Sequence, residues 1–242
     1  MKRLLLAAAA ISLAVPASAA TVITADRYLD VETGRYVQNP AIFVDGTGHI
    51  TSIADARTVR WGSDVKHIDL GNRTLLPGLI DMHTHLGPAN IGGYRFLEYT
   101  GSFWPIVATR TARDMLDGGF TTMRVVGSGD WTDVGLKQAI EAGYVVGPRI
   151  VPAGHALGAT GGHCDDTYLP PELQKDKKEE GIGDSPEELK YQVRRQRKFG
   201  AEVIKVCATG GVFSRGDTPG QQQLTEDELR AIADEAHMQG LR

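Results

Sequence analysis

The sequence predicts an α/β fold in which part of a small β-sandwich precedes the N-terminal half of a (β/α)8 TIM barrel. Short β-prone pieces broken by Asp, Gly and Asn occupy residues 21–76. From residue 77 onward, four strand patterns are each followed by a helix pattern, which is typical of parallel βαβ units. A complete barrel needs eight such units and typically about 250 residues. Four units predict half a barrel.

The first residues have the pattern of a secretory signal peptide. Lys2 and Arg3 form a basic start, residues 4–15 are apolar, and an Ala-x-Ala cleavage motif stands at 17–19. The apolar run is too short to span a membrane. We therefore expect residues 1–20 to be removed and the mature protein to be secreted or periplasmic. The net charge of −4 gives no reason to expect a nucleic-acid or membrane partner.

The expected elements follow in order along the chain. The β-prone pieces are TVITADRYL (21–29), AIFVDG (41–46), HITSIADA (49–56) and VKHIDLG (65–71). The strands of the barrel region are 76–82, 120–126, 149–154 and 201–211, and we expect the first to be buried. The helices are 106–116, 133–142, 185–200 and 225–240. Ser185 with Glu188, and Thr225 with Glu228, have the spacing of capping boxes.

Two histidines follow the first barrel strand. His83 and His85 are two residues apart, so in a strand they project to the same side, as two ligands of one metal ion would. A glycine-rich phosphate turn would normally stand here in a doubly wound sheet, whereas barrels keep their active sites at the carboxyl ends of strands. A pair of ordinary surface or core histidines is the alternative for a bare His-x-His motif.

Lys205 lies inside the last strand pattern, which is apolar on both sides. Burial disfavours the ammonium form, and a neutral amine can react with carbon dioxide to form a carbamate that bridges two metals. The alternative is a lysine whose head reaches water at the end of the strand.

Four segments together resemble the amidohydrolase superfamily: PGLIDMHTHL, GFTTMRVVGSGD, TGGHCDD and VIKVCATGGVFSRGD. They are most similar to its imidazolonepropionase-like and Xaa-Pro dipeptidase-like branch. The resemblance implies a barrel with a small β-sandwich, in which His83 and His85 bind the more buried of two divalent metals, with zinc as the expected ion. Carboxylated Lys205 would bridge the two metals. Relatives take further histidines from the fifth and sixth strands and an aspartate from the eighth, so we expect this chain to be an N-terminal fragment.

Other candidate residues lie near the expected site. His163 could contact a substrate carbonyl or carboxylate, or stabilise its loop, and His155 is a further candidate for a substrate contact. Asp81 is expected to orient its neighbours or to pair with backbone. Cys164 and Cys207 would lie at the ends of adjacent strands, where a disulfide is favoured over two thiols near the metals.

The resulting prediction is a metal-dependent hydrolase of amide or peptide-like C–N bonds, acting on a small molecule such as a dipeptide, an N-acyl amino acid or a cyclic amide. A non-catalytic remnant that binds a metal or ligand is the alternative. We expect a homo-oligomer for the full-length enzyme and poor stability for the isolated chain, because half a barrel exposes its strand edges.

Overall fold

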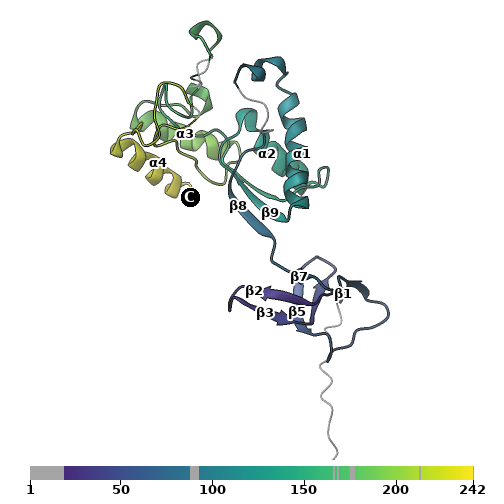
Figure 1. The fold of residues 1–242 in the computed structure, drawn as a ribbon. Coiled ribbons are helices and arrows are strands. Elements are labelled where there is room, and N and C mark those ends of the chain that lie inside the picture. Colours follow the sequence, from purple (N-terminus) through teal and green to yellow (C-terminus); the bar gives the residue numbers. More distant parts are fainter. Residues whose placement is uncertain are drawn as a thin grey trace, which may run out of the picture. The chain divides into compact units, whose positions relative to one another are not determined.

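The computed structural model describes residues 19–87, 93–165, 167, 169–174, 178–212 and 214–241. Most of the expected signal peptide lies outside these residues. The chain divides into two compact units, Met1–Pro77 and Gly78–Arg242 (Figure 1). Within the described part of the chain, none of the helices has the length and apolar character needed to cross a membrane.

The first unit contains a four-stranded sheet in the order β5-β4-β1-β6. Its strands are β1 (Ala19–Thr24), β4 (Pro40–Asp45), β5 (Ile50–Asp55) and β6 (Lys66–Asp69). β4 pairs antiparallel with both β1 and β5, and β6 runs parallel to β1. The buried apolar side chains on this sheet and its adjoining loop are Val22, Ala41, Phe43 and Val59.

A second, three-stranded sheet of this unit has the order β3-β2-β7. It consists of β2 (Arg27–Asp30), β3 (Arg35–Gln38) and β7 (Thr74–Leu75). The β-prone piece over 21–29 is divided between β1 and β2. The chain changes sheet between them, where the Asp26 N–H donates to the Gly71 carbonyl at 2.9 Å. The sequence analysis missed β3, whose residues are all exposed and show no apolar alternation.

The second unit is built on a parallel sheet in the order β10-β9-β8. The strands are β8 (Leu79–Thr84), β9 (Phe120–Val125) and β10 (Arg149–Pro152), and both pairings are parallel (Figure 1). These are three of the four strands expected in this region. Their parallel pairing confirms the prediction of parallel βαβ units over residues 76–154.

Two helices connect these strands. α1 (Phe103–Asp117) joins β8 to β9, and α2 (Thr132–Glu141) joins β9 to β10. α1 is longer at both ends than the expected helix over 106–116. The helices pack on the sheet through one cluster of buried apolar side chains: Leu86, Ala108, Ala112, Met123, Val125, Leu136 and Ile150.

The other two helices, α3 (Pro186–Lys198) and α4 (Glu226–Met238), pack against each other (Figure 1). Thr225 and Glu228 form the complete capping box that the sequence predicted at the start of α4. Ser185 caps α3 by accepting the Glu188 N–H, which is half of the predicted capping box. The other half differs, because the Glu188 carboxylate accepts the N–H of Asp184 at 2.8 Å. Buried apolar residues beneath the pair are Leu157, Leu189, Val193, Leu224, Ile232, Ala236 and Leu241.

Short 3-10 helices lie in the loops after the strands. They are η1 (Gly93–Glu98), η2 (Gly129–Trp131), η3 (Pro171–Leu173) and η4 (Lys178–Glu180). In η2, Asp130 and Trp131 both have positive φ, at 49° and 57°. Such backbone is uncommon outside glycine and often marks a functional site.

The expected burial of the first barrel strand was wrong for this chain. Leu79, Ile80 and Met82 of β8 are 45%, 59% and 51% exposed. The reason is that β8 is an edge strand of its sheet, with β9 on one side only among the described residues. The exposed strand edge expected for half a barrel is thus present here.

The expected fourth strand over 201–211 was also wrong. This segment runs beside 152–157, where it forms one isolated parallel bridge between Leu157 and Val206. The Gly154 N–H is bound by the Asp133 carboxylate and the His155 N–H by the Gln196 side chain, both at 2.9 Å. Because these two N–H groups are turned away from the 201–207 segment, no continuous ladder forms.

Candidate metal centre and substrate pocket

The two histidines of the His-x-His motif lie at the carboxyl end of β8. His83 and His85 have ring centroids 5.6 Å apart at 66°, while Thr84 between them is buried and donates its hydroxyl to the Arg124 carbonyl at 3.1 Å. The alternation of the strand thus turns both imidazoles to one side, as the spacing predicted. Asp81 accepts the His83 N–H at 3.0 Å, so it pairs with backbone as expected.

All five residues predicted for the site line one cavity of about 330 Å³, which we call the histidine cavity. They come from separate segments: the end of β8, the loops that follow β10, and the 201–207 segment. The five residues are His83, His85, His155, His163 and Lys205. The sequence therefore identified residues that the fold brings together, and their chemical roles remain predictions.

The electrostatics of the cavity favour a neutral imidazole at His85. Burial lowers the pKa of His85, and positive charge on His83, Lys205 and His163 acts in the same direction. His85 is exposed to solvent and lines the histidine cavity. Its Nδ1 lies 3.3 Å from the Gly127 carbonyl, an arrangement that would fix the tautomer and leave Nε2 as the ligand nitrogen.

Lys205 is half-buried and shares the cavity with the two histidines. Its backbone is fixed because its carbonyl accepts the Leu157 N–H at 2.8 Å, and the Cys207 N–H donates to the Leu157 carbonyl at 2.8 Å. Cys207 is also bonded to Cys164, with 5.8 Å between the Cα atoms. This confirms the predicted disulfide, which joins the loop of His163 to the segment of Lys205.

A hydrogen-bond network that the sequence analysis missed holds His163. Its N–H donates to Gln223 Oε1 at 2.9 Å, and its Nδ1 lies 3.1 Å from Ser214 Oγ. Ser214 in turn donates to Asp217, and this bond is the largest cause that lowers the pKa of the Asp217 carboxyl. Because the Ser214 hydrogen goes to Asp217, the Ser214 oxygen accepts the hydrogen of His163 Nδ1. The partners are 51 and 60 positions from His163, so no local pattern indicates them.

His155 also lines the cavity, but it is 6% exposed and packed. Its ring lies edge-on to Trp131, with centroids 4.5 Å apart at 81°. The Trp131 ring also contacts Phe199 and the Arg195 guanidinium. These contacts give His155 a clear packing role beside any role in substrate binding.

The donors of the cavity suit part of a metal site. Two imidazoles are common ligands for zinc, and Lys205 would add an anionic ligand if it were carboxylated. Within the residues that the structure describes, no group of three His, Cys, Asp or Glu side chains could hold a metal ion. His83, His85 and Lys205 therefore fit as some of the ligands of a centre that needs others.

Comparison with protein families identifies the chain. The model of the "Amidohydrolase family" matches residues 74–242, the segment that carries the histidine cavity. The chain belongs to the amidohydrolase family. This confirms the resemblance seen in the four sequence motifs.

Relatives of this amidohydrolase include ochratoxinase from Aspergillus niger, which is 35% identical over 186 residues, covering 68% of this chain and 37% of ochratoxinase. A solved Xaa-Pro dipeptidase with methionine bound in its active site is 31% identical, with a TM-score of 0.81 over 91% of this chain and 55% of that chain. The solved A. niger ochratoxinase gives 28%, a TM-score of 0.76, and coverage of 90% and 54%. The mixed α/β chain thus corresponds to about half the length of relatives with the amidohydrolase barrel fold.

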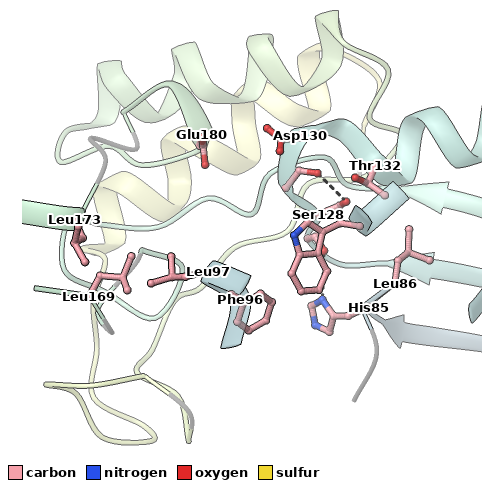
Figure 2. A pocket seen from close by; sticks show the side chains of 14 residues that line it. His85, Leu86, Phe96, Leu97, Ser128, Asp130, Thr132, Leu169, Leu173 and Glu180 are labelled. Carbon is pink, nitrogen blue, oxygen red and sulfur yellow. Dashed lines mark hydrogen bonds between the residues drawn. The ribbon is translucent and has the colours of Figure 1, made fainter. Parts of the chain in front are cut away.

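A second pocket, of about 560 Å³, adjoins the histidine cavity (Figure 2). Most of its side chains are apolar, and we call it the apolar pocket: Leu86, Phe96, Leu97, Trp104, Leu169 and Leu173. The two share part of their lining, namely His85, Gly127, Ser128, Gly129 and Glu180. The sequence analysis did not predict this pocket, because its residues come from four segments without a common motif.

Proposed function

We propose that this amidohydrolase chain forms the front half of a metal-dependent hydrolase that cleaves an amide or peptide-like C–N bond. Dipeptides, N-acyl amino acids and cyclic amides are the substrate classes. The observation that carries the proposal is that His83, His85 and Lys205 line one cavity although they come from distant segments. The names of the relatives, a Xaa-Pro dipeptidase and ochratoxinase, support a hydrolytic reaction on small molecules.

Two divalent cations, with zinc as the first choice, would be held by His83, His85 and the carbamate of Lys205. The carbamate forms when neutral Nζ attacks carbon dioxide: a C–N bond forms and a proton leaves the nitrogen. When bound, such a pair of cations supplies Lewis acidity at the scissile carbonyl and activates water near neutral pH. The remaining ligands and the group that handles the proton would come from residues beyond this chain.

The chain's own residues orient these ligands and the substrate. Asp81 fixes the backbone of His83, and the Gly127 carbonyl fixes the His85 ring. His163, held by Ser214, would contact the substrate's carbonyl or carboxylate. His155 lines the same cavity behind it and limits the space available to the substrate.

Metal content tests the proposal. We expect the protein, expressed from the full reading frame that contains this chain, to purify with two divalent cations, and Lys205→Ala to lose at least one of them. Lys190→Ala is the matched control, because Lys190 lies on α3 and pairs only loosely with Glu187 at 3.6 Å. Two metals retained in Lys205→Ala, measured by inductively coupled plasma mass spectrometry, would disprove the bridging role of Lys205.

A second candidate is a protein that binds a metal or ligand without catalysis. The observation behind it is that the chain covers only 55% and 54% of the solved Xaa-Pro dipeptidase and ochratoxinase chains. A panel of dipeptides, N-acyl amino acids and cyclic amides separates the two candidates. Turnover that is abolished by a chelator supports the hydrolase, and metal binding without turnover of any panel member supports the second candidate.

Export of the protein is also proposed. The signal-peptide pattern of residues 1–20 supports it, and so does the Cys164–Cys207 disulfide, since such bonds persist mainly in oxidising compartments. We expect the mature N-terminus at residue 20 or 21 and recovery of the protein from the periplasm or the medium. N-terminal sequencing of the fractionated protein that finds Met1 retained in the cytoplasm would contradict this.

A further inference from the structure

The apolar pocket opens directly beside the atoms where the proposed reaction occurs. His85 and the 127–129 turn line both the apolar pocket and the histidine cavity. Figure 2 shows His85 and Phe96 on the same side of the apolar pocket, with Leu97, Leu169 and Leu173 gathered at its other end. A molecule whose reacting group lies near His85 can therefore extend into the apolar pocket without leaving the protein surface.

The lining is suited to a flat ring. Phe96 stacks on Trp104 with centroids 4.8 Å apart and an interplanar angle of 30°. Phe96, Leu97 and Leu173 are 50%, 58% and 57% exposed. Large apolar side chains that are exposed singly need no explanation, but several that converge on one concave site mark a ligand pocket. The volume of about 560 Å³ is in the range of pockets that hold drug-sized groups.

The charges of the apolar pocket select against anions. Asp130 and Glu180 contribute carboxyl groups to its lining, and none of the described lining residues is lysine or arginine. Figure 2 places both acidic side chains at one end of the apolar pocket, away from Leu97 and Leu169. A carboxylate bound there would meet like charge and an apolar wall, and no lysine or arginine of the described lining would offset its lost hydration.

We propose that the apolar pocket binds an uncharged aromatic group of the substrate, attached close to the scissile amide. The preferred substrates are then amides that carry a bulky neutral ring, with any carboxylate of the substrate directed away from the apolar pocket. This assignment rests on the proposed function, because it takes His85 to mark the place where the amide reacts.

Binding of 2-naphthamide tests the assignment independently of turnover. This neutral compound consists only of a ring and an amide, and 6-carboxy-2-naphthamide is its anionic counterpart. A fluorescence titration is expected to show the neutral compound binding about tenfold or more tightly than the anionic one. Asp130→Asn, which suits the positive φ at this position, should narrow that difference.

Variants of the lining residues test whether the naphthalene ring binds in the apolar pocket. Phe96→Ala should weaken binding of 2-naphthamide about tenfold, since it removes both apolar area and the stack on Trp104. Tyr191→Ala is the matched control: Tyr191 on α3 is 53% exposed and lies outside the lining of the apolar pocket, so binding should stay within about twofold. Leu97→Ala serves as the second variant if Phe96→Ala does not fold.

The outcomes separate the two proposals. Loss of 2-naphthamide affinity in Phe96→Ala or Leu97→Ala, without hydrolysis of any amide, would support the pocket assignment and contradict the proposed function. Hydrolysis of simple amides combined with unchanged naphthamide affinity in both variants would overturn the pocket assignment and leave the function intact. Absence of 2-naphthamide binding to the wild-type protein would also overturn the assignment.

Discussion

The histidine cavity has two sides that are held in different ways. On the strand side, His83 lies in β8 and His85 directly follows it, and β8 pairs parallel with β9 from Leu79 to Thr84 with two register irregularities. On the loop side, Lys205 and His163 lie in segments without regular secondary structure. Their positions depend on a few bonds: the bridge at Leu157, the network of Ser214, and the Cys164–Cys207 disulfide.

This difference indicates which side of the histidine cavity should open more easily. A parallel ladder distributes its stability over many backbone hydrogen bonds, so losing one side chain changes it little. The loop side concentrates its stability in a small number of cross-links, which hold the candidate site residues Lys205 and His163. Local opening should therefore begin on the loop side.

Removal of the disulfide should have the largest effect. The bond closes a loop with a sequence separation of 43, for which the chain-entropy model gives about 4 kcal/mol of stabilisation. Replacing both cysteines, Cys164→Ser with Cys207→Ser, should lower the free energy of unfolding by about that amount. The measurement is chemical denaturation, followed by hydrogen exchange read segment by segment.

In the double cysteine variant, hydrogen exchange should differ between the strand side and the loop side of the histidine cavity. The 157–165 and 201–211 segments should lose protection, while β8 and β9 should keep theirs because their ladder is intact. Adding a reductant to the wild-type protein is the parallel experiment and should reproduce the pattern. Equal loss of protection on both sides would show that the cavity is one cooperative unit.

Asp133 should have the next largest effect, because it ties α2 to the loop after β10. Its buried carboxylate accepts the N–H groups of Gly154 and Val134, both at 2.9 Å. Asp133→Asn keeps the shape but turns an amide N–H toward one of these donors. We expect a loss of about 2 kcal/mol of unfolding free energy from denaturation at neutral pH.

The stability difference between the wild type and Asp133→Asn should depend on pH. Burial raises the pKa of Asp133, and it outweighs the backbone hydrogen bonds that lower it. A folded-state pKa above the unfolded one means that the folded protein binds this proton more tightly. The contribution is therefore fully present below the unfolded pKa of about 3.9 and is lost as the pH rises through the folded value. The stability difference between wild type and Asp133→Asn should be larger near pH 4 than at pH 7, and a constant difference would contradict the raised pKa.

The capped start of a helix, and the side of a strand to which a residue points, could be predicted from the sequence because both depend on neighbouring residues. The Thr225 and Glu228 capping box needs only a spacing of three, and the shared direction of His83 and His85 needs only a period of two. Lys205 could be singled out because it interrupts an apolar pattern, and the fold does bring it to the same cavity. The family resemblance supported its role as a bridge between metals.

The rest depended on contacts between distant segments. The apolar run 201–207 has the pattern of a strand, but the Gly154 and His155 N–H groups are taken by side chains of α2 and α3, so the ladder fails. Ser214 and Gln223 contact His163 from distant parts of the chain, and Asp217 accepts hydrogen bonds from both. No local pattern in the sequence contains this information.

The smallest effect is expected at Gly211, which lies against His163. A Cβ added there would come within 2.1 Å of the imidazole Cε1 and Nδ1. Because His163 is exposed and can move, Gly211→Ala should cost about 1 kcal/mol or less in stability but displace the ring from Ser214. The measurement is the NMR shift of the imidazole nitrogens, which should report loss of the bond.

Gly135 provides the matched control for this change. It lies within α2, and an added Cβ would meet nothing within 4 Å. Gly135→Ala should raise the unfolding free energy by about 0.5–1 kcal/mol through helix propensity and leave the His163 signal unchanged. A His163 shift of similar size in both variants would show that Gly211 is not a specific support for the ring.

The central claim is that His83, His85 and Lys205 hold a dinuclear metal centre, and anomalous X-ray diffraction from zinc-loaded crystals tests it most directly. The account predicts two zinc peaks about 3.5–4 Å apart, with nitrogens of His83 and His85 about 2.0–2.1 Å from one of them. It also predicts density for a carbamate on Lys205 between the two peaks. Zinc peaks outside the histidine cavity, or an unmodified Lys205 directed away from them, would contradict it.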